Sequence, residues 1–141
     1  MSAKGNAEWQ GDLKSGKGTF TAGDSITGEY SFKSRFEDGP GANPEQLIAA
    51  AHASCFSMAL SAALEEAGSV ADSVKTDAKV TLRLLDDGPS ITKIELATVG
   101  VVPGLDDAKF QEIAAGAKAN CPVSKALAGV PDITLEATLE T

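Results

Sequence analysis

A long stretch without a charged side chain, from Leu47 to Leu64, limits what this chain can fold into more than any other feature. A helix-start pattern precedes it: Asn43 is the expected N-cap, and Pro44 follows at the first helical position. Gln46 completes a capping-box spacing, and Gly68 is the expected C-terminal cap. The pattern predicts a helix over residues 44–67, about 35 Å long.

This helix is apolar on nearly every side, so nearly every side must be covered. A single sheet covers one side only, and a second copy of the chain is the simplest cover for the rest. The stretch also approaches the minimum length of a membrane span. Its histidine and serines interrupt it, however, and most of its other residues are alanine. We therefore predict a buried helix in a homodimer and no membrane partner.

Length and charge restrict the class of protein further. The 141 residues predict a single domain, residues 1–141. Twelve Lys plus Arg stand against twenty Asp plus Glu, and this net charge of −8 argues against a nucleic-acid partner. No signal-peptide pattern is present, which predicts a cytoplasmic protein. Two cysteines are too few for a disulfide scaffold and indicate packed or redox-active thiols.

Strand patterns lie on both sides of the central helix. The expected elements before it are a hairpin from strands 9–13 and 18–21, a third strand over 30–36 that alternates aromatic residues with Arg35, and a Gly/Pro loop over 37–43. After it, strands are expected over 74–84 and 91–102, joined by a turn at 86–89. The first of these would turn Val74, Thr76, Ala78, Val80, Leu82 and Leu84 to one face.

The last third of the chain has helical patterns followed by one more strand. Asp106 is expected to cap a helix that carries Phe110, Ile113, Ala114 and Ala117 on one stripe. A short helix is expected after Cys121 and Pro122, and a final strand over 133–139. This order of elements predicts an α+β fold with antiparallel or mixed sheets.

Cys55 lies in the middle of the uncharged helix, and its chemistry is ambiguous. A free cysteine often packs as a small hydrophobic residue, and without further evidence this inert interpretation is favoured. A reactive thiol needs a group that stabilises the thiolate, such as a cation or a helix N-terminus. The mid-helix position denies Cys55 the helix N-terminus, so a cation would have to come from elsewhere.

Cys121 is placed differently, because Pro122 is a good first helical residue and makes Cys121 the expected N-cap. Unpaired backbone N–H groups there favour an anion and lower the pKa of a thiol. An ordinary cysteine before a helix is an equally good interpretation. The absence of a Cys-x-x-Cys pattern argues against a thioredoxin-like or zinc site, and one histidine cannot build a His-rich metal site.

Three further residues are candidates for the surroundings of the thiols. His52 stands three residues before Cys55 and could act as a base, although a satisfied core histidine is the more common case. Arg35 could stabilise a thiolate or be an ordinary surface charge. Glu45 could hold that arginine by a bidentate pair or be a favourable first-turn charge. These residues do not by themselves choose between the alternatives.

Two segments resemble a known family. SRFEDGPGANPEQLIAAAHASCFSMAL, residues 34–60, resembles the signature of the OsmC/Ohr family of thiol peroxidases, and ANCPVS, residues 119–124, resembles its second cysteine motif. The similarity covers nearly the whole chain, including GNAEWQGD near its start and VPG before the third-quarter helix. The histidine before the first cysteine and the placement of Arg-Phe resemble the OsmC branch more closely than the Ohr branch.

The resemblance implies an intertwined homodimer whose sheets wrap around two long buried central helices. It also implies that Cys55 is the peroxidatic nucleophile and Cys121 the resolving thiol, with Arg35 stabilising the Cys55 thiolate and Glu45 holding Arg35. The expected substrates are organic hydroperoxides and, more weakly, hydrogen peroxide. A Cys55–Cys121 disulfide would form and be reduced by an external dithiol, such as a lipoyl-type thiol, with no metal or other cofactor.

Helix geometry adds a prediction of its own. Ten residues separate Glu45 from Cys55, which is about 15 Å along a helix axis and too far for one compact site. We therefore expect two chains to build each pocket, with antiparallel central helices. Two other functions stay open at this point: a non-enzymatic thiol redox sensor, and a dimer that binds hydrophobic small ligands with both thiols inert.

Overall fold

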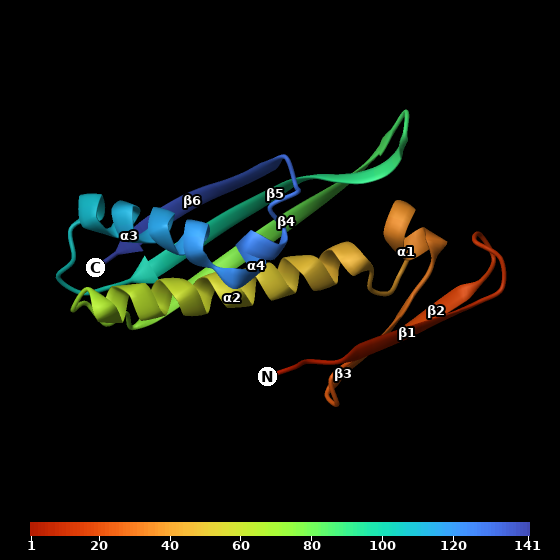
Figure 1. Ribbon diagram of the computed structural model, residues 1–141, viewed down its shortest axis with the longest axis horizontal. Coiled ribbons are helices and arrows are strands. Elements are labelled where there is room, and N and C mark those ends of the chain that lie inside the picture. The colour runs from red at the N-terminus through yellow and green to blue at the C-terminus, as the bar shows by residue number, and fades with distance from the viewer. The chain divides into compact units, whose positions relative to one another are not determined.

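A computed structural model describes residues 1–141, and its internal contacts divide the chain into two compact units, Met1–Leu47 and Ile48–Thr141. Each unit contains one three-stranded sheet (Figure 1). Helices accompany both sheets, so the α+β fold class predicted from the sequence is confirmed. One domain over residues 1–141 stays a prediction.

The first unit contains an antiparallel sheet in the order β1-β2-β3, formed by Gly5–Gln10, Lys17–Ala22 and Ile26–Tyr30. The predicted hairpin is present, but its first strand spans Gly5–Gln10 and not 9–13, so the prediction of strand for residues 11–13 is wrong. Gly18 pairs with Trp9 on one side and with Tyr30 on the other. The two rings lie 5.6 Å apart across it, and a Cβ at Gly18 would come within 2.5 Å of the Tyr30 ring. Only glycine leaves the rings this space.

The predicted strand over residues 30–36 is wrong beyond Tyr30, because Phe32–Phe36 forms the short helix α1. Ser31 is its N-cap and forms a reciprocal capping box with Ser34. Phe32 and Phe36 are therefore one helical turn apart, with ring centroids at 5.0 Å. The spacing of these two aromatic residues fits a strand and a helix equally well, and the two serines favour the helix.

The central helix α2 spans Pro44–Glu66, close to its predicted bounds. The Asn43 side chain accepts a hydrogen bond from the Gln46 backbone at 2.8 Å, as expected of an N-cap. At the other end Gly68 has a φ of 88°, and the N–H of Ser69 donates to the carbonyl of Leu64. This is the pattern of a Schellman cap.

By length and composition α2 could cross a membrane, a test that core helices of soluble proteins also pass. Only 22% of its most apolar window is buried by the residues of one chain. Met58, in the middle of α2, is 77% exposed. The chain by itself therefore covers little of its most apolar helix.

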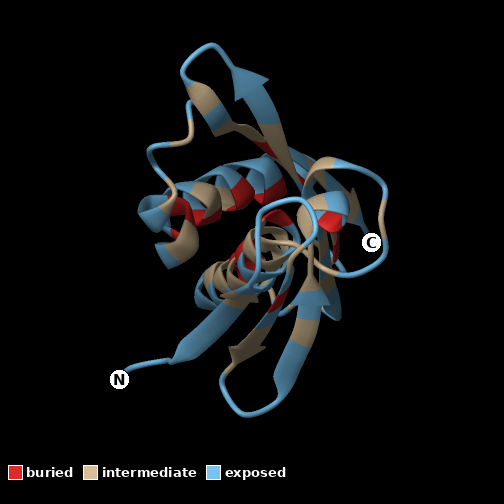
Figure 2. Cartoon of the chain, turned by 90° about the vertical axis from the view of Figure 1, so that its right-hand side faces the viewer, coloured by how far each residue is buried: buried red, intermediate tan, exposed pale blue.

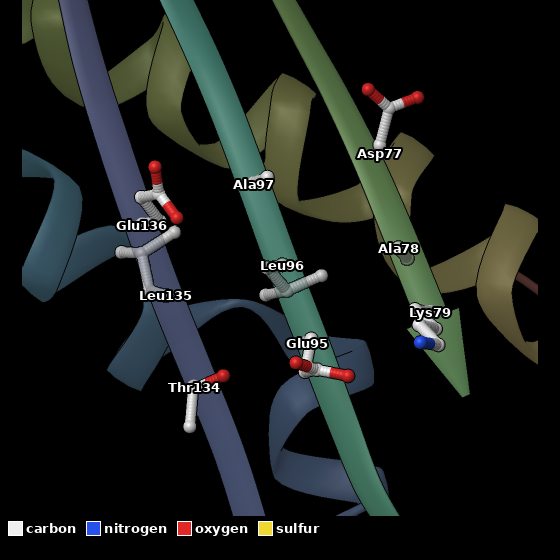
Figure 3. Close-up of a pocket in the computed structure, with 9 residues that line it drawn as sticks. All are labelled: Asp77, Ala78, Lys79, Glu95, Leu96, Ala97, Thr134, Leu135 and Glu136. Carbon is white, nitrogen blue, oxygen red and sulfur yellow. The ribbon is translucent and has the colours of Figure 1, made fainter. Parts of the chain in front are cut away.

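The second unit contains a mixed sheet in the order β4-β5-β6, formed by Ser73–Leu85, Gly88–Val101 and Asp132–Glu140. Strands β4 and β5 are antiparallel, whereas β5 and β6 are parallel. A parallel pair needs a crossover, and the crossover consists of α3, Asp107–Asn120, and α4, Pro122–Ala126. Charged side chains lie on the face of this sheet away from the helices, including Asp77, Lys79, Glu95 and Glu136 (Figure 3).

The expected alternation along β4 holds from Val74 to Val80 and then changes. The pairing register shifts between Thr81 and Leu82, as at a β-bulge. Beyond this point Leu84 is 73% exposed, and the expectation that it shares one face with the earlier residues stays a prediction. Thr81 pairs with Lys93 and Leu82 with Ile91, so the extra residue at this step is Thr92 of β5.

The core of the second unit lies between its helices and its sheet (Figure 2). It is formed by apolar side chains of α2, β5 and α3 together with Cys121, and includes Phe56, Leu60, Leu64, Ile94, Leu96, Phe110, Ala114 and Ala117. The predicted Asp106 cap is confirmed, because its carboxylate accepts from the Lys109 backbone at 2.7 Å. The final strand alternates as predicted.

Replacing Phe110 with alanine is expected to lower the free energy of unfolding by about 3–5 kcal/mol. Phe110 is fully buried, and its ring covers Gly100 so closely that a Cβ there would lie 2.6 Å away. Urea denaturation at one fixed protein concentration measures the change. The exposed Leu84→Ala variant is the control, with an expected change below about 0.5 kcal/mol. Equal changes in the two variants would contradict the assigned core.

Candidate active site

The two cysteines, far apart in the sequence, meet within the second unit. Cys55 comes from the middle of α2, and Cys121 from the junction of α3 and α4. Their Sγ atoms lie 3.1 Å apart, within hydrogen-bonding distance of two thiols, and both cysteines are free. Cys121 is fully buried, whereas Cys55 is only partly buried. Of the two cysteines, only Cys55 has part of its surface exposed in the single chain.

Cys121 is held by two helices at once. Its backbone N–H donates to the carbonyl of Ala117 at 2.8 Å and so ends α3, and Pro122 directly begins α4. The predicted N-cap position of Cys121 is confirmed. Because the same residue closes one helix and opens the next, the direction of its Cα–Cβ bond is set by both helices.

The pKa of Cys121 lies below its ordinary value. Burial alone would raise this pKa, but hydrogen bonds from the Ser124 backbone, the Cys55 side chain and the Ser124 hydroxyl outweigh burial. The two backbone hydrogen bonds that lower this pKa, from Val123 and Ser124, come from the start of α4, and a role for the Cys121 thiolate stays a prediction.

The pKa of Cys55 lies above its ordinary value. Burial is the main cause and the neighbouring Cys121 adds to it, while a hydrogen bond from the Val123 backbone opposes part of the rise. A thiol that attacks a substrate must be a thiolate. Within the second unit Cys55 therefore lacks the cation that such a role requires.

His52 is fully buried one turn before Cys55. Its Nε2 atom lies 2.7 Å from the Ser124 hydroxyl, and its Nδ1 atom has no hydrogen-bond partner. Burial lowers the pKa of His52, so the neutral imidazole is favoured. Sequence reasoning named His52 but missed Ser124. The sequence feature that could have indicated Ser124 is its position three residues after the expected N-cap Cys121, from which a side chain can reach back to the N-cap residue.

Arg35 and Glu45 form an ion pair within the first unit. The Nη2 and Nε atoms of Arg35 lie 2.8 Å and 3.0 Å from the same carboxylate oxygen, Oε1. Glu45 is buried and Arg35 is partly exposed. The prediction that Arg35 lies on a strand is wrong, because it belongs to α1 and stacks over Phe36 at 5.5 Å.

The predicted site residues thus form two separate pairs. The thiol pair belongs to the second unit and the ion pair to the first. A single site containing all four residues stays a prediction. The structure contains no group of three or more His, Cys, Asp or Glu side chains that could hold a metal ion.

Comparisons with known proteins give consistent matches. The family model described as OsmC-like protein matches residues 37–136. The chain is 48% identical over 140 residues to Peroxiredoxin OsmC of Escherichia coli strain K12, covering 98% of this chain and 96% of that one. It is 38% identical over 98 residues to an organic hydroperoxide resistance protein of Xanthomonas axonopodis pv. citri, covering 69% and 67% of the two chains.

Solved structures share the fold. The organic hydroperoxide resistance protein OhrB of Bacillus subtilis superimposes with a TM-score of 0.71 at 27% identity, covering 99% of this chain and 98% of that one. An OsmC-like protein of Mycoplasma pneumoniae has a TM-score of 0.77 at 15% identity, covering 100% and 99%. The second likeness concerns the fold alone.

Proposed function

The chain belongs to the OsmC family, and on this premise we propose that it is a cysteine-dependent peroxidase. Its substrates are organic hydroperoxides and, more weakly, hydrogen peroxide. The observation that carries this proposal is the pair of free thiols with sulfur atoms 3.1 Å apart, one of them partly exposed. The names of the two relatives, a peroxiredoxin and an organic hydroperoxide resistance protein, support the same chemistry.

In the first step the Cys55 thiolate attacks the distal oxygen of the hydroperoxide. The O–O bond breaks, the alkoxide leaves and takes up a proton to become an alcohol, and Cys55 becomes a sulfenic acid. The partial exposure of Cys55 supports this assignment, because the fully buried Cys121 offers no approach to a substrate.

In the second step Cys121 attacks the Cys55 sulfenic acid. The S–S bond forms, the S–O bond breaks and water is released. Contact between the two sulfur atoms and the lowered pKa of Cys121 both favour this step. An external dithiol, such as a lipoyl-type thiol, then reduces the disulfide by exchange. A cytoplasmic location stays a prediction.

The cation that Cys55 needs is Arg35, held by Glu45, from the second chain of a homodimer. Ten residues of α2 separate Glu45 from Cys55, about 15 Å along the helix axis. Antiparallel α2 helices from two chains would bring the ion pair of one chain to the thiols of the other. The raised pKa of Cys55 within its own unit supports the need for such a cation.

Steady-state consumption of an alkyl hydroperoxide and of hydrogen peroxide, each with several dithiol reductants, tests the function. We expect many turnovers per chain and a faster reaction with the alkyl hydroperoxide. A redox sensor would consume about one equivalent of peroxide without a reductant and, with a dithiol present, would not turn over many peroxides per chain. A dimer that only binds hydrophobic ligands would consume none. Either of these two results would contradict the proposal.

The dimer can be tested on its own through Met58. A Met58→Glu substitution is expected to convert the dimer into a monomer, because it places a charge in the exposed apolar middle of α2. Sedimentation velocity measures the oligomeric state. Leu13→Glu is the control, since Leu13 is also exposed but lies in the turn between β1 and β2. A wild-type chain that sediments as a monomer would contradict the proposed dimer.

A further inference from the structure

A buried group of polar side chains extends from His52 toward the two thiols. His52 contacts the Ser124 hydroxyl at 2.7 Å. Ser124 lies in the first turn of α4, three residues after the N-cap Cys121, and its hydroxyl helps to lower the pKa of that thiol. The Cys121 sulfur in turn lies 3.1 Å from the Cys55 sulfur. His52, Ser124 and Cys121 are all buried. His52 is the only histidine of the chain, and the chemistry above gives it no role.

The unpartnered Nδ1 atom of His52 indicates which ring nitrogen carries the proton. A buried N–H group without an acceptor is rarer in proteins than a buried acceptor without a donor. The proton therefore belongs on Nε2, which donates to the Ser124 oxygen. With its oxygen already accepting from His52, the Ser124 hydroxyl is free to donate its own proton to the Cys121 sulfur.

We propose that His52 is a positioning residue for the resolving step, acting through Ser124 to stabilise the Cys121 thiolate. The proposal rests on the proposed function, because it requires Cys121 to be the resolving thiol. His52 touches neither the substrate nor the reacting sulfur atoms in this scheme. It fixes the rotation of the Ser124 hydroxyl, which would otherwise be free to donate back to His52.

The step balances without a further reactant. Cys121 releases its thiol proton to water and becomes a thiolate, which receives the hydrogen bond of Ser124. The thiolate attacks the sulfur of the Cys55 sulfenic acid, so that the S–S bond forms while the S–O bond breaks. The hydroxide that leaves takes up a proton and becomes water. Cys121 sulfur is oxidised and Cys55 sulfur is reduced to the disulfide level.

The first test measures the pKa of Cys121 directly, in a Cys55→Ser background where Cys121 is the only thiol. The ultraviolet absorbance of the thiolate is followed during a pH titration. His52→Leu and Ser124→Ala are each expected to raise the Cys121 pKa by about one unit or more, because each removes support for a hydrogen bond to a charged group. His52→Gln keeps a donor near the Nε2 position and is expected to restore the wild-type value.

Controls separate this effect from general damage and from other charges. Ser57→Ala is the control for the loss of a serine hydroxyl. The Ser57 hydroxyl, in α2, donates to Thr76 at 2.8 Å, and its removal should leave the Cys121 pKa unchanged. Cys55 is the titratable group in contact with Cys121, and the background substitution removes it. Lys118 of α3 and Lys125 of α4 line a groove that includes Ser124, and both stay in place in every variant.

The second test follows a single turnover with both cysteines present. After one equivalent of an alkyl hydroperoxide, rapid quenching with a sulfenic-acid trap and mass spectrometry separates the two steps. In His52→Leu we expect sulfenic acid to form at the wild-type rate and the disulfide to form about tenfold to a hundredfold more slowly. His52→Gln should recover most of this loss.

Each outcome bears on one proposal. Disulfide formation as fast in His52→Leu as in the wild type would overturn the role of His52. So would a His52→Gln variant as slow as His52→Leu, because the restored donor would then have no effect. Absence of sulfenic acid in Cys121→Ser after peroxide addition would instead contradict the proposed peroxidase function.

Discussion

Replacing Cys55 with serine is expected to abolish catalytic consumption of hydroperoxides, with a loss of at least about a thousandfold. The serine hydroxyl has nearly the size of the thiol but is not a thiolate at neutral pH, so no sulfenic acid can form. Cys121 cannot substitute, because it is fully buried behind Cys55. Peroxide consumption with a dithiol reductant measures the loss.

Cys121→Ser is the matched control, since it changes the other thiol by the same atom. This variant should still consume about one equivalent of peroxide and accumulate a sulfenic acid on Cys55, detected by trapping and mass spectrometry. Its disulfide cannot form, so turnover would depend on direct attack by an external thiol. If Cys121→Ser lost the first equivalent and Cys55→Ser retained it, the two assigned roles would have to be exchanged.

The second large effect concerns Arg35, whose replacement with methionine is expected to slow peroxide reduction by about a hundredfold or more. Methionine keeps much of the apolar length of arginine and removes its charge. Burial raises the pKa of Cys55, and without the guanidinium only the Val123 backbone opposes that rise. The fraction of Cys55 thiolate, measured by alkylation across pH, should fall together with the rate.

Mixed dimers reveal which chain supplies Arg35. Inactive Arg35→Met and Cys55→Ser chains are unfolded together and refolded in equal amounts, so that random pairing produces mixed dimers. If each site combines Cys55 of one chain with Arg35 of the other, one site of each mixed dimer is intact, and about a quarter of the wild-type activity returns. If each chain completes its own site, the mixture stays inactive.

Two further mixtures complete this experiment. Each variant refolded alone must stay inactive, which excludes recovery by refolding itself. Adding Glu45→Gln to the Cys55→Ser chain should reduce the recovered activity, because in that mixture the Cys55→Ser chain supplies the working Arg35 and its Glu45 partner. Adding it to the Arg35→Met chain should have no comparable effect. The reverse pattern would contradict a site shared between two chains.

Much of the secondary structure could be predicted because its signals are local. The Asn43 cap, the Gly68 terminus and the Asp106 cap each depend on residues within one or two helical turns, and all three are present. The failure at residues 32–36 is also local: an aromatic pattern predicted a strand, and the Ser31–Ser34 capping box favours a helix. The change along β4 depends on a shift in pairing with β5, which no local pattern contains.

By itself the sequence determined most of the elements, the bounds of the central helix and the position of Cys121 at the start of a short helix, since periodicity and capping act between neighbouring residues. Only the tertiary structure decided that Cys55 and Cys121 are in contact and that His52 reaches Ser124. These contacts join α2 to the α3–α4 crossover. Their distances depend on how the crossover packs against the sheet, and a linear pattern carries no measure of that packing.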